Sequence, residues 1–318
     1  MKIRSLVGFA LLFVFTVWLY FVTIYNTYQT QYVFLIVFSF FIIGSFFALY
    51  YVFRDELIKR SEKTLKLNVH GIEFLMVFIG AIITYIVHHY LGAGAVLASA
   101  FVGLMAGFFI KKYAVPIFCG SFVGMSSPLL LGLFPFILAS LLASLVFILV
   151  KDMFNGYGGK LGTIALIGAL ITTFVLGDAL DGPPPFTMTE QIVIFILSSV
   201  AAVITYSVSV RLKQGPVIAS ALVGIVAGAL FPLLNDFGIT LAIVAFGASF
   251  VGMSSPSRLP DERYIVVAGI LFGLIYVFSA PYFNGAGGKL GTIAFASTLS
   301  VGGLKIIYNR YLNKPHQC

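Results

Sequence analysis

The chain has 318 residues, of which 60% are hydrophobic and 9% are charged, and its mean hydropathy is +1.06. Soluble domains carry about 25% charged residues, so this composition excludes an ordinary soluble protein and indicates an all-α polytopic membrane protein. A net charge of +8 would suit nucleic acid, but the basic residues stand singly or in pairs at the ends of apolar runs. That pattern is typical of membrane orientation, so we expect no nucleic-acid partner.

Twelve apolar stretches are predicted to form transmembrane helices. The first follows Lys2 and Arg4. Because it is long and no small-residue cleavage site follows it, we interpret it as an uncleaved helix rather than a signal peptide. In chain order the stretches are residues 5–27, 32–53, 69–90, 93–110, 113–126, 128–150, 161–177, 190–210, 215–234, 238–254, 264–282 and 289–307.

The stretches 113–126 and 238–254 are each either a full crossing or a re-entrant segment. The first is short for a straight helix across a bilayer. A re-entrant segment there would place Arg211 and Lys213 outside the cell, which the positive-inside rule disfavours. We therefore favour a short or broken helix that completes the crossing.

The distribution of lysine and arginine supports the number of crossings. With a cytoplasmic N-terminus and strict alternation, 18 of the 19 Lys and Arg residues fall on the inner side, and Lys289 alone falls outside. We therefore predict an integral protein of the plasma (inner) membrane with both termini in the cytoplasm. The basic segment 54–66 is expected to face anionic lipid.

Two blocks of sequence occur twice. Residues 121–128, SFVGMSSP, are identical to residues 249–256, and residues 154–165, FNGYGGKLGTIA, return at 283–294 with Tyr157 changed to Ala286. We predict two repeat units, residues 69–189 and 190–318, the second ending in a short tail. Each unit has five crossings, and because an odd number inverts the second unit, the repeat is expected to be inverted. Residues 1–68 are expected to form two peripheral helices and the basic loop.

The inverted arrangement predicts that each membrane face carries a serine-rich block from one unit and a Gly-Gly-Lys block from the other, close together in space. The arrangement of two inverted units with five crossings each is similar to that of urea transporters and ammonium channels. The similarity is one of architecture alone, because the chain shares no signature motif with them. The two N-terminal helices lie outside the repeat and are candidates for homo-oligomer contacts.

Cys119 and Cys318 form no disulfide or metal pattern, and we expect no metal and no cofactor.

The Gly-Gly-Lys block begins an apolar helix, whose first turn has free N–H donors and a positive dipole end that favour an anion. The structural alternative is a glycine-rich turn that allows close helix packing while the lysine reaches the headgroups. In the serine block, a proline ends or bends the helix, and the serines either cap the next helix or offer hydroxyls to a solute.

These motifs predict a channel or facilitated transporter for a small polar or anionic solute, with its path between the two units. The alternatives are a translocator of phospholipid headgroups and a membrane-embedded Ser/Lys hydrolase, which the symmetry of the motifs disfavours. We assign no catalytic residue. The predicted path residues are Ser121, Gly124, Ser126, Ser127, Asn155, Gly158, Gly159, Lys160, Thr163, Ser249, Gly252, Ser254, Ser255, Asn284, Gly287, Gly288, Lys289 and Thr292.

Overall fold

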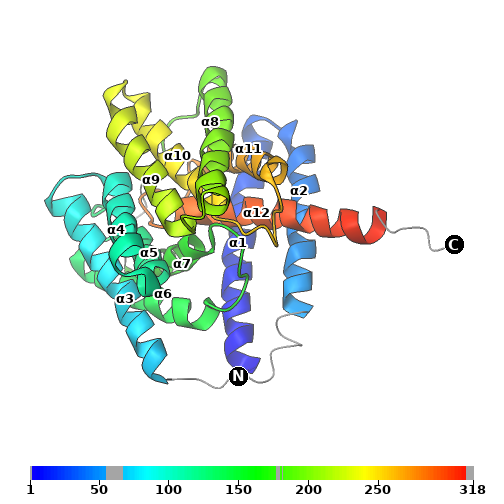
Figure 1. Cartoon of the computed structure of the whole chain (residues 1–318). Helices are drawn as coiled ribbons and strands as arrows, with labels where there is room; N and C mark the ends of the chain where they lie inside the picture. Colours follow the sequence, from blue (N-terminus) through cyan, green and yellow to red (C-terminus); the bar gives the residue numbers. More distant parts are fainter. Residues whose placement is uncertain (1, 55–66, 177–179, 181, 313–318) are drawn as a thin grey trace.

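The computed structural model describes residues 2–54, 67–176, 180 and 182–312 (Figure 1). These residues form α-helices joined by loops and short π- and 3-10-helical turns, and none of them lies in a strand. The helices are α1 Lys2–Thr30, α2 Phe34–Val52, α3 Leu67–Tyr85, α4 Ala95–Phe109, α5 Ala114–Gly124, α6 Leu133–Val150, α7 Lys160–Leu176, α8 Met188–Tyr206, α9 Pro216–Leu230, α10 Phe237–Gly252, α11 Glu262–Ser279 and α12 Lys289–Ile307.

Within the described residues, 8 helices are long and apolar enough to cross a membrane, which agrees with an integral membrane protein. Three shorter apolar helices are α4, α7 and α10, and α5 has only 11 residues. The short π-helices Ile86–Tyr90 and Ser207–Arg211 continue α3 and α8, and the 3-10 turn Phe231–Leu233 extends α9 to a span of 18 residues. Most of the basic segment predicted to face anionic lipid, residues 55–66, lies outside the described part of the chain, as does Cys318.

The centre of the molecule is built on α5 and α10, which are buried over most of their length. Small residues bring them against their neighbours: a Cβ on Gly120 of α5 would overlap the carbonyl oxygen of Val77 in α3. Close approach of this kind favours helix association where lipid removes the hydrophobic driving force. Each short helix is therefore held by a long one, α5 by α3 and α10 by α8.

The N-terminal helices pack on α12. An added Cβ on Gly303 of α12 would overlap the carbonyl oxygen of Gly44 in α2, so the two backbones are in direct contact. The buried Tyr20 hydroxyl of α1 lies 2.6 Å from the Ser45 hydroxyl and 2.7 Å from the Ser300 hydroxyl. Satisfied polar groups of this kind hold three helices together in an apolar interior. In Figure 1, α12 runs crosswise to the upright pair α1 and α2.

Candidate functional site

The serine blocks and the glycine-rich loops meet twice, each time across the two units. The Gly287 N–H donates to the Ser126 hydroxyl oxygen at 3.0 Å, and the Gly158 N–H donates to that of Ser254 at 3.1 Å. Both serines are buried. The predicted proximity of the two kinds of block is confirmed by these two bonds.

A second pair of backbone bonds closes the same junctions. The Ser127 N–H donates to the carbonyl oxygen of Gly285 at 2.8 Å, and that of Ser255 donates to the carbonyl oxygen of Gly156 at 2.9 Å. Both junctions are therefore closed by backbone and buried hydroxyl groups, and in the first loop Arg258 Nε also donates to the Asn155 carbonyl oxygen at 3.0 Å. Each junction is thus a rigid support on which a lysine follows at the start of a helix.

Glycine is required where these loops turn. Gly159 and Gly288 have φ of 84° and 95°, a left-handed conformation that residues with a Cβ rarely adopt. Gly158 and Gly287 face the carbonyl oxygens of Phe250 and Phe122, which a Cβ would overlap. The duplicated Gly-Gly pair therefore has a steric explanation that holds in both loops.

The first turns of α7 and α12 cross at the middle of the molecule. A Cβ on Gly162 would overlap the Cα of Gly291, and the reverse also holds. The two helix starts, each with its lysine, consequently lie against each other between the two sequence units. The N–H groups of a first helical turn have no partner within the helix, so this crossing gathers such donors near the centre.

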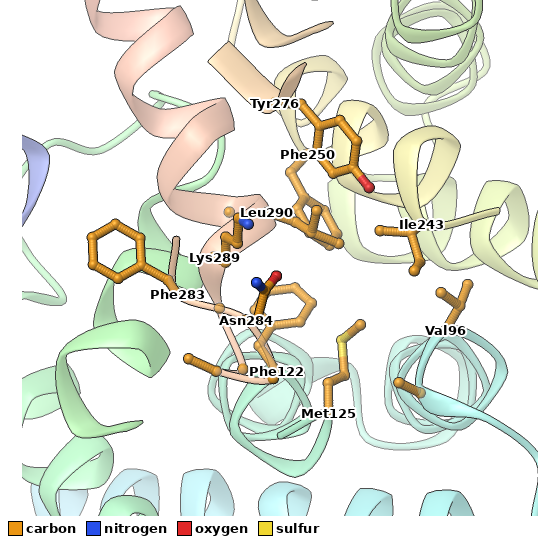
Figure 2. Close-up of a pocket in the computed structure, with 16 residues that line it drawn as sticks. Val96, Phe122, Met125, Ile243, Phe250, Tyr276, Phe283, Asn284, Lys289 and Leu290 are labelled. Carbon is orange, nitrogen blue, oxygen red and sulfur yellow. The ribbon is translucent and has the colours of Figure 1, made fainter. Parts of the chain in front are cut away.

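A cavity of about 200 Å³ lies beside the start of α12 (Figure 2). One wall is the loop 283–288 with Lys289. The opposite wall comes from Val96 of α4 and Ile243 of α10. Phe122 of α5 and Phe250 of α10 also line it, as does Tyr276 of α11. The cavity is therefore formed jointly by both units rather than within either one.

Lys289 is the only charged side chain among the described residues that line this cavity. Its Nζ donates to the carbonyl oxygen of Ala280 at 3.1 Å. The neighbouring Asn284 side chain donates to the Pro281 carbonyl at 3.3 Å. The cavity thus combines one lysine side chain and the N–H groups of a first helical turn with walls that are otherwise mostly apolar.

Four phenylalanines close the centre of the molecule next to the cavity. Phe118 and Phe122 of α5 have ring centroids 4.5 Å apart, and Phe246 and Phe250 of α10 are 4.8 Å apart. Phe122 and Phe250 join the two pairs at 4.7 Å. All four side chains are buried. The four rings therefore form a buried aromatic cluster, and two of them, Phe122 and Phe250, line the cavity.

The two glycine-rich loops differ in their surroundings. The loop 283–288 lines the central cavity, whereas the loop 154–159 does not. Lys160 Nζ donates to the carbonyl oxygens of Lys151 at 2.9 Å and Met153 at 2.8 Å, and to Asn155 Oδ1 at 2.8 Å. Tyr157 stands where the second unit has Ala286. Its ring packs on Gly302 of α12, and the guanidinium carbon of Arg258 lies 4.7 Å from the centre of the ring.

A separate cavity of about 420 Å³ lies on the side of Val115, Pro216 and Val217. These residues are the sequence counterparts of Ile243, Ala95 and Val96, which line the cavity at Lys289. No described residue of the loop 154–159 and none of the four phenylalanines lines this second cavity. The two sides of the molecule therefore differ in depth: one cavity reaches the centre and the other does not.

The remaining predicted residues have structural contacts. Ser121 and Ser249 each lie within hydrogen-bond distance of a serine on the preceding helix, Ser99 at 2.8 Å and Ser220 at 2.7 Å. Thr292 donates to the Gly288 carbonyl at 3.2 Å, whereas the Thr163 hydroxyl is buried without a hydrogen-bond partner. Gly124 and Gly252 pack on the backbones of α3 and α8. None of these groups is among the residues that line the central cavity.

Sequence reasoning missed the phenylalanines and the role of α1. Phe122 and Phe250 stand inside the duplicated serine block, so the repeat itself carried the signal. On α1, Phe9 stacks on Phe154 at 5.8 Å and Trp18 meets Phe283 edge-on at 5.1 Å. No sequence signal marked these contacts, because α1 has no counterpart in the repeat.

Among the described residues there is no group of three or more His, Cys, Asp or Glu that could hold a metal ion. No family model matches the chain, and no curated protein or solved structure is detectably similar to it.

Proposed function

We propose that the protein is a channel or facilitated transporter for a small polar or anionic solute, with its path between two inverted repeat units. The observation that supports this most is the cavity of about 200 Å³ that both units form and that ends on Phe122 and Phe250. Binding sites between repeats, at the starts of helices interrupted by glycine, are typical of membrane transporters.

The preference for an anion follows from the lining of the cavity. In its protonated form Lys289 supplies a positive charge, and the described residues that line the cavity include no carboxylate. The first turn of α12 adds N–H donors and the positive end of the helix dipole. A small anion that enters would exchange part of its water for these donors, while a cation would find no compensating charge.

The paired junctions support the inverted repeat that we propose. Each bond from Ser126 or Ser127 to the second unit has a counterpart from Ser254 or Ser255 to the first. Exchange of this kind is what a two-fold axis between the units would produce. In the proposed mechanism the deep cavity is the open side, and the cluster of Phe118, Phe122, Phe246 and Phe250 is a closed barrier. Movement at this barrier passes the solute onward.

Solute flux into proteoliposomes tests this function. Purified protein would be reconstituted, and uptake of small inorganic and organic anions would be compared with uptake of urea-sized neutral solutes and of monovalent cations. We expect saturable or channel-like anion uptake well above that of protein-free vesicles. Equal leakage of all solutes, or none above the vesicle control, would contradict the proposal.

A second candidate function, a phospholipid translocator, is favoured by one further observation. A mostly apolar cavity of about 270 Å³ lies beside the central one and shares Phe283, Asn284 and Ala286 with it. Its other lining residues include Trp18 and the exposed Phe174. A lipid could place its headgroup at Lys289 and its chains in this apolar cavity. Dithionite quenching of fluorescent phospholipids in the same vesicles would reveal scrambling.

The hydrolase alternative gains no support from the described contacts. The hydroxyl oxygens of Ser126 and Ser254 accept backbone N–H bonds, and neither serine hydrogen-bonds a lysine. A serine nucleophile needs a neighbouring base to take its proton.

A further inference from the structure

A groove of about 570 Å³ lies between the start of α11 and the end of α12, apart from the central cavity. Its floor and walls are apolar and come from Val267, Val301 and Leu304. Arg263 and Lys305 stand among its lining residues, together with Tyr264 and Tyr308. The groove therefore combines an apolar channel with cationic and phenolic groups, which is the chemistry of a phospholipid and not of a purely apolar partner.

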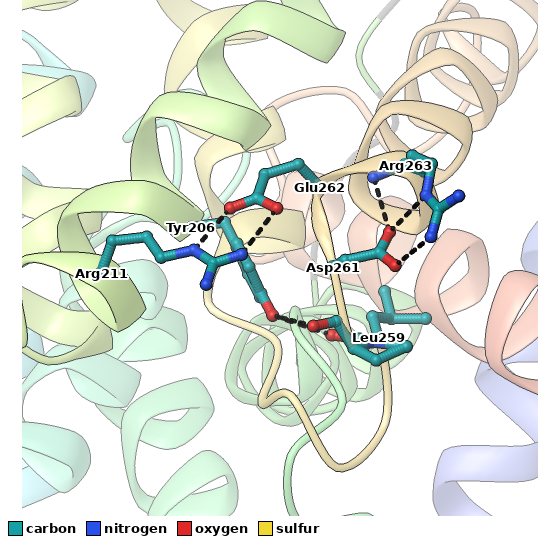
Figure 3. A network of polar contacts seen from close by, with 7 residues as sticks. Tyr206, Arg211, Leu259, Asp261, Glu262 and Arg263 are labelled. Atoms are coloured by element: carbon teal, nitrogen blue, oxygen red, sulfur yellow. Dashed lines mark hydrogen bonds and ion pairs between the residues drawn. The ribbon is translucent and has the colours of Figure 1, made fainter.

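The carboxylates near this groove are already paired (Figure 3). Glu262 binds Arg211 through two bonds, at 2.8 and 2.9 Å, on the side of α8. Asp261 binds Arg263 at 3.0 Å, and this hydrogen bond keeps the pKa of the Asp261 carboxyl below its usual value. The two acids therefore stay ionised and are each matched by an arginine.

Lys305 has no such partner among the described residues. Its Nζ donates to the carbonyl oxygens of Arg258 at 3.1 Å and Ser257 at 3.4 Å, which are neutral. These acceptors hold the ammonium beside the groove without cancelling its charge. Arg263 adds further donors, because its bonds to Asp261 use Nε and Nη2 only and its side chain is 90% exposed.

The phenolic side chains complete the site. Tyr264 and Tyr308 line the groove, and Tyr308 is 51% exposed. Tyrosines at the ends of membrane helices lie at headgroup level, with the ring in the apolar region and the hydroxyl towards water. The groove is thus placed where a headgroup and the first part of an acyl chain are both within reach.

We propose that this groove is a binding site for an anionic phospholipid. The phosphate accepts hydrogen bonds from Lys305 and Arg263, and an acyl chain covers Val267, Val301 and Leu304. This site does not depend on the proposed transport function, because it shares no residue with the central cavity.

Native mass spectrometry of the full-length protein in detergent tests the site. The apparent affinity for phosphatidylglycerol, which is anionic, would be measured against that for phosphatidylcholine, which has no net charge. We expect the wild type to prefer phosphatidylglycerol and Lys305→Gln to weaken that binding about tenfold, the value of one charge-assisted hydrogen bond. Lys112→Gln is the control, since it removes an exposed charge at another helix end and should leave the preference unchanged.

A second variant keeps the charges and fills the groove. Val267 is 41% exposed, so Val267→Trp is accommodated without disturbing the core and should weaken binding of both lipids. Equal affinity of the wild type for the two lipids would overturn the proposal, as would equal losses in Lys305→Gln and Lys112→Gln. A dimeric mass that disappears in Val267→Trp would instead assign the groove to a second copy of the chain.

Discussion

The two glycine-rich loops differ by one residue over twelve positions, yet they have different surroundings. In the first loop Tyr157 is buried against α12, and Lys160 is held by three oxygens. In the second loop Ala286 leaves space, and Lys289 makes one bond beside a cavity. The shared residues build the same junction twice, and the described residues that line the central cavity include the second loop and none of the first.

We propose that the same lysine has a structural role in one unit and a solute-binding role in the other. A lysine satisfied by buried carbonyl oxygens fixes the loop that supplies them. A lysine with a single carbonyl partner keeps donors for a ligand. The comparison leads to four predictions, given from the largest expected effect to the smallest.

Substitution of the shared glycines should destabilise the protein equally in both loops. Gly158→Ala and Gly287→Ala each force a Cβ against a backbone carbonyl oxygen of the facing helix, which cannot move without shifting that helix. We expect each variant to lose about 3 kcal/mol of stability, the upper range for overpacking. Thermal unfolding in detergent measures this. Tolerance of either substitution would show that the junctions are looser than the contacts imply.

Replacing each of the two lysines should destabilise the protein by a different amount. Lys160→Gln removes an ammonium that three oxygens accept from, and we expect a loss of about 2 kcal/mol, as for a partly buried charged hydrogen bond. Lys289→Gln removes one such bond and should cost less than about 1 kcal/mol. Unfolding midpoints of the two variants, measured side by side, provide the test. A larger loss for Lys289→Gln would reverse the assignment of roles.

The single difference between the loops should control access to the cavity. Ala286→Tyr places in the second loop the residue that closes the first, and we expect solute flux to fall about tenfold, equivalent to about 1.4 kcal/mol. Flux in proteoliposomes is the readout. Ala286→Ser is the control because it adds polarity without bulk. Unchanged flux in Ala286→Tyr, with the protein folded, would remove the loop from the solute path.

The serine hydroxyls at the junctions should have small and equal effects. Ser126→Ala and Ser254→Ala each leave a buried glycine N–H without its acceptor, at 3.0 and 3.1 Å in the native protein. We expect about 1 kcal/mol of destabilisation from each. Unfolding midpoints of the two single variants check the match. Unequal losses would show that the two junctions are not equivalent.

The fold was predictable from sequence to the extent that apolar runs and turn residues determine it. Each predicted stretch coincides with a helix to within a few residues, because Gly, Pro and charged residues mark the ends. The short length of α5 was also visible, since Lys112 and Pro128 bound its apolar run. The crosswise direction of α12 was not, because helix packing angles depend on contacts between distant residues.

The candidate site was predictable only in part. Exact duplication pointed to the serine blocks, the Gly-Gly pairs and the lysines, and all of these lie at the two junctions. In the sequence alone, however, the two copies of each block look equivalent. Their difference depends on where the ring of Tyr157 packs and on which carbonyl oxygens surround Lys160. Such contacts arise from tertiary packing against α12 and from loop geometry, which no local pattern encodes.

The central claim is that Lys289, and not Lys160, meets the solute. The most direct measurement is the initial rate of anion uptake by vesicles that carry equal amounts of folded Lys289→Gln, Lys289→Arg or Lys160→Gln protein. We predict that uptake falls at least tenfold in Lys289→Gln, is largely restored in Lys289→Arg, and stays within about twofold of wild type in folded Lys160→Gln. Equal uptake by the two glutamine variants, or a loss confined to Lys160→Gln, would contradict the account.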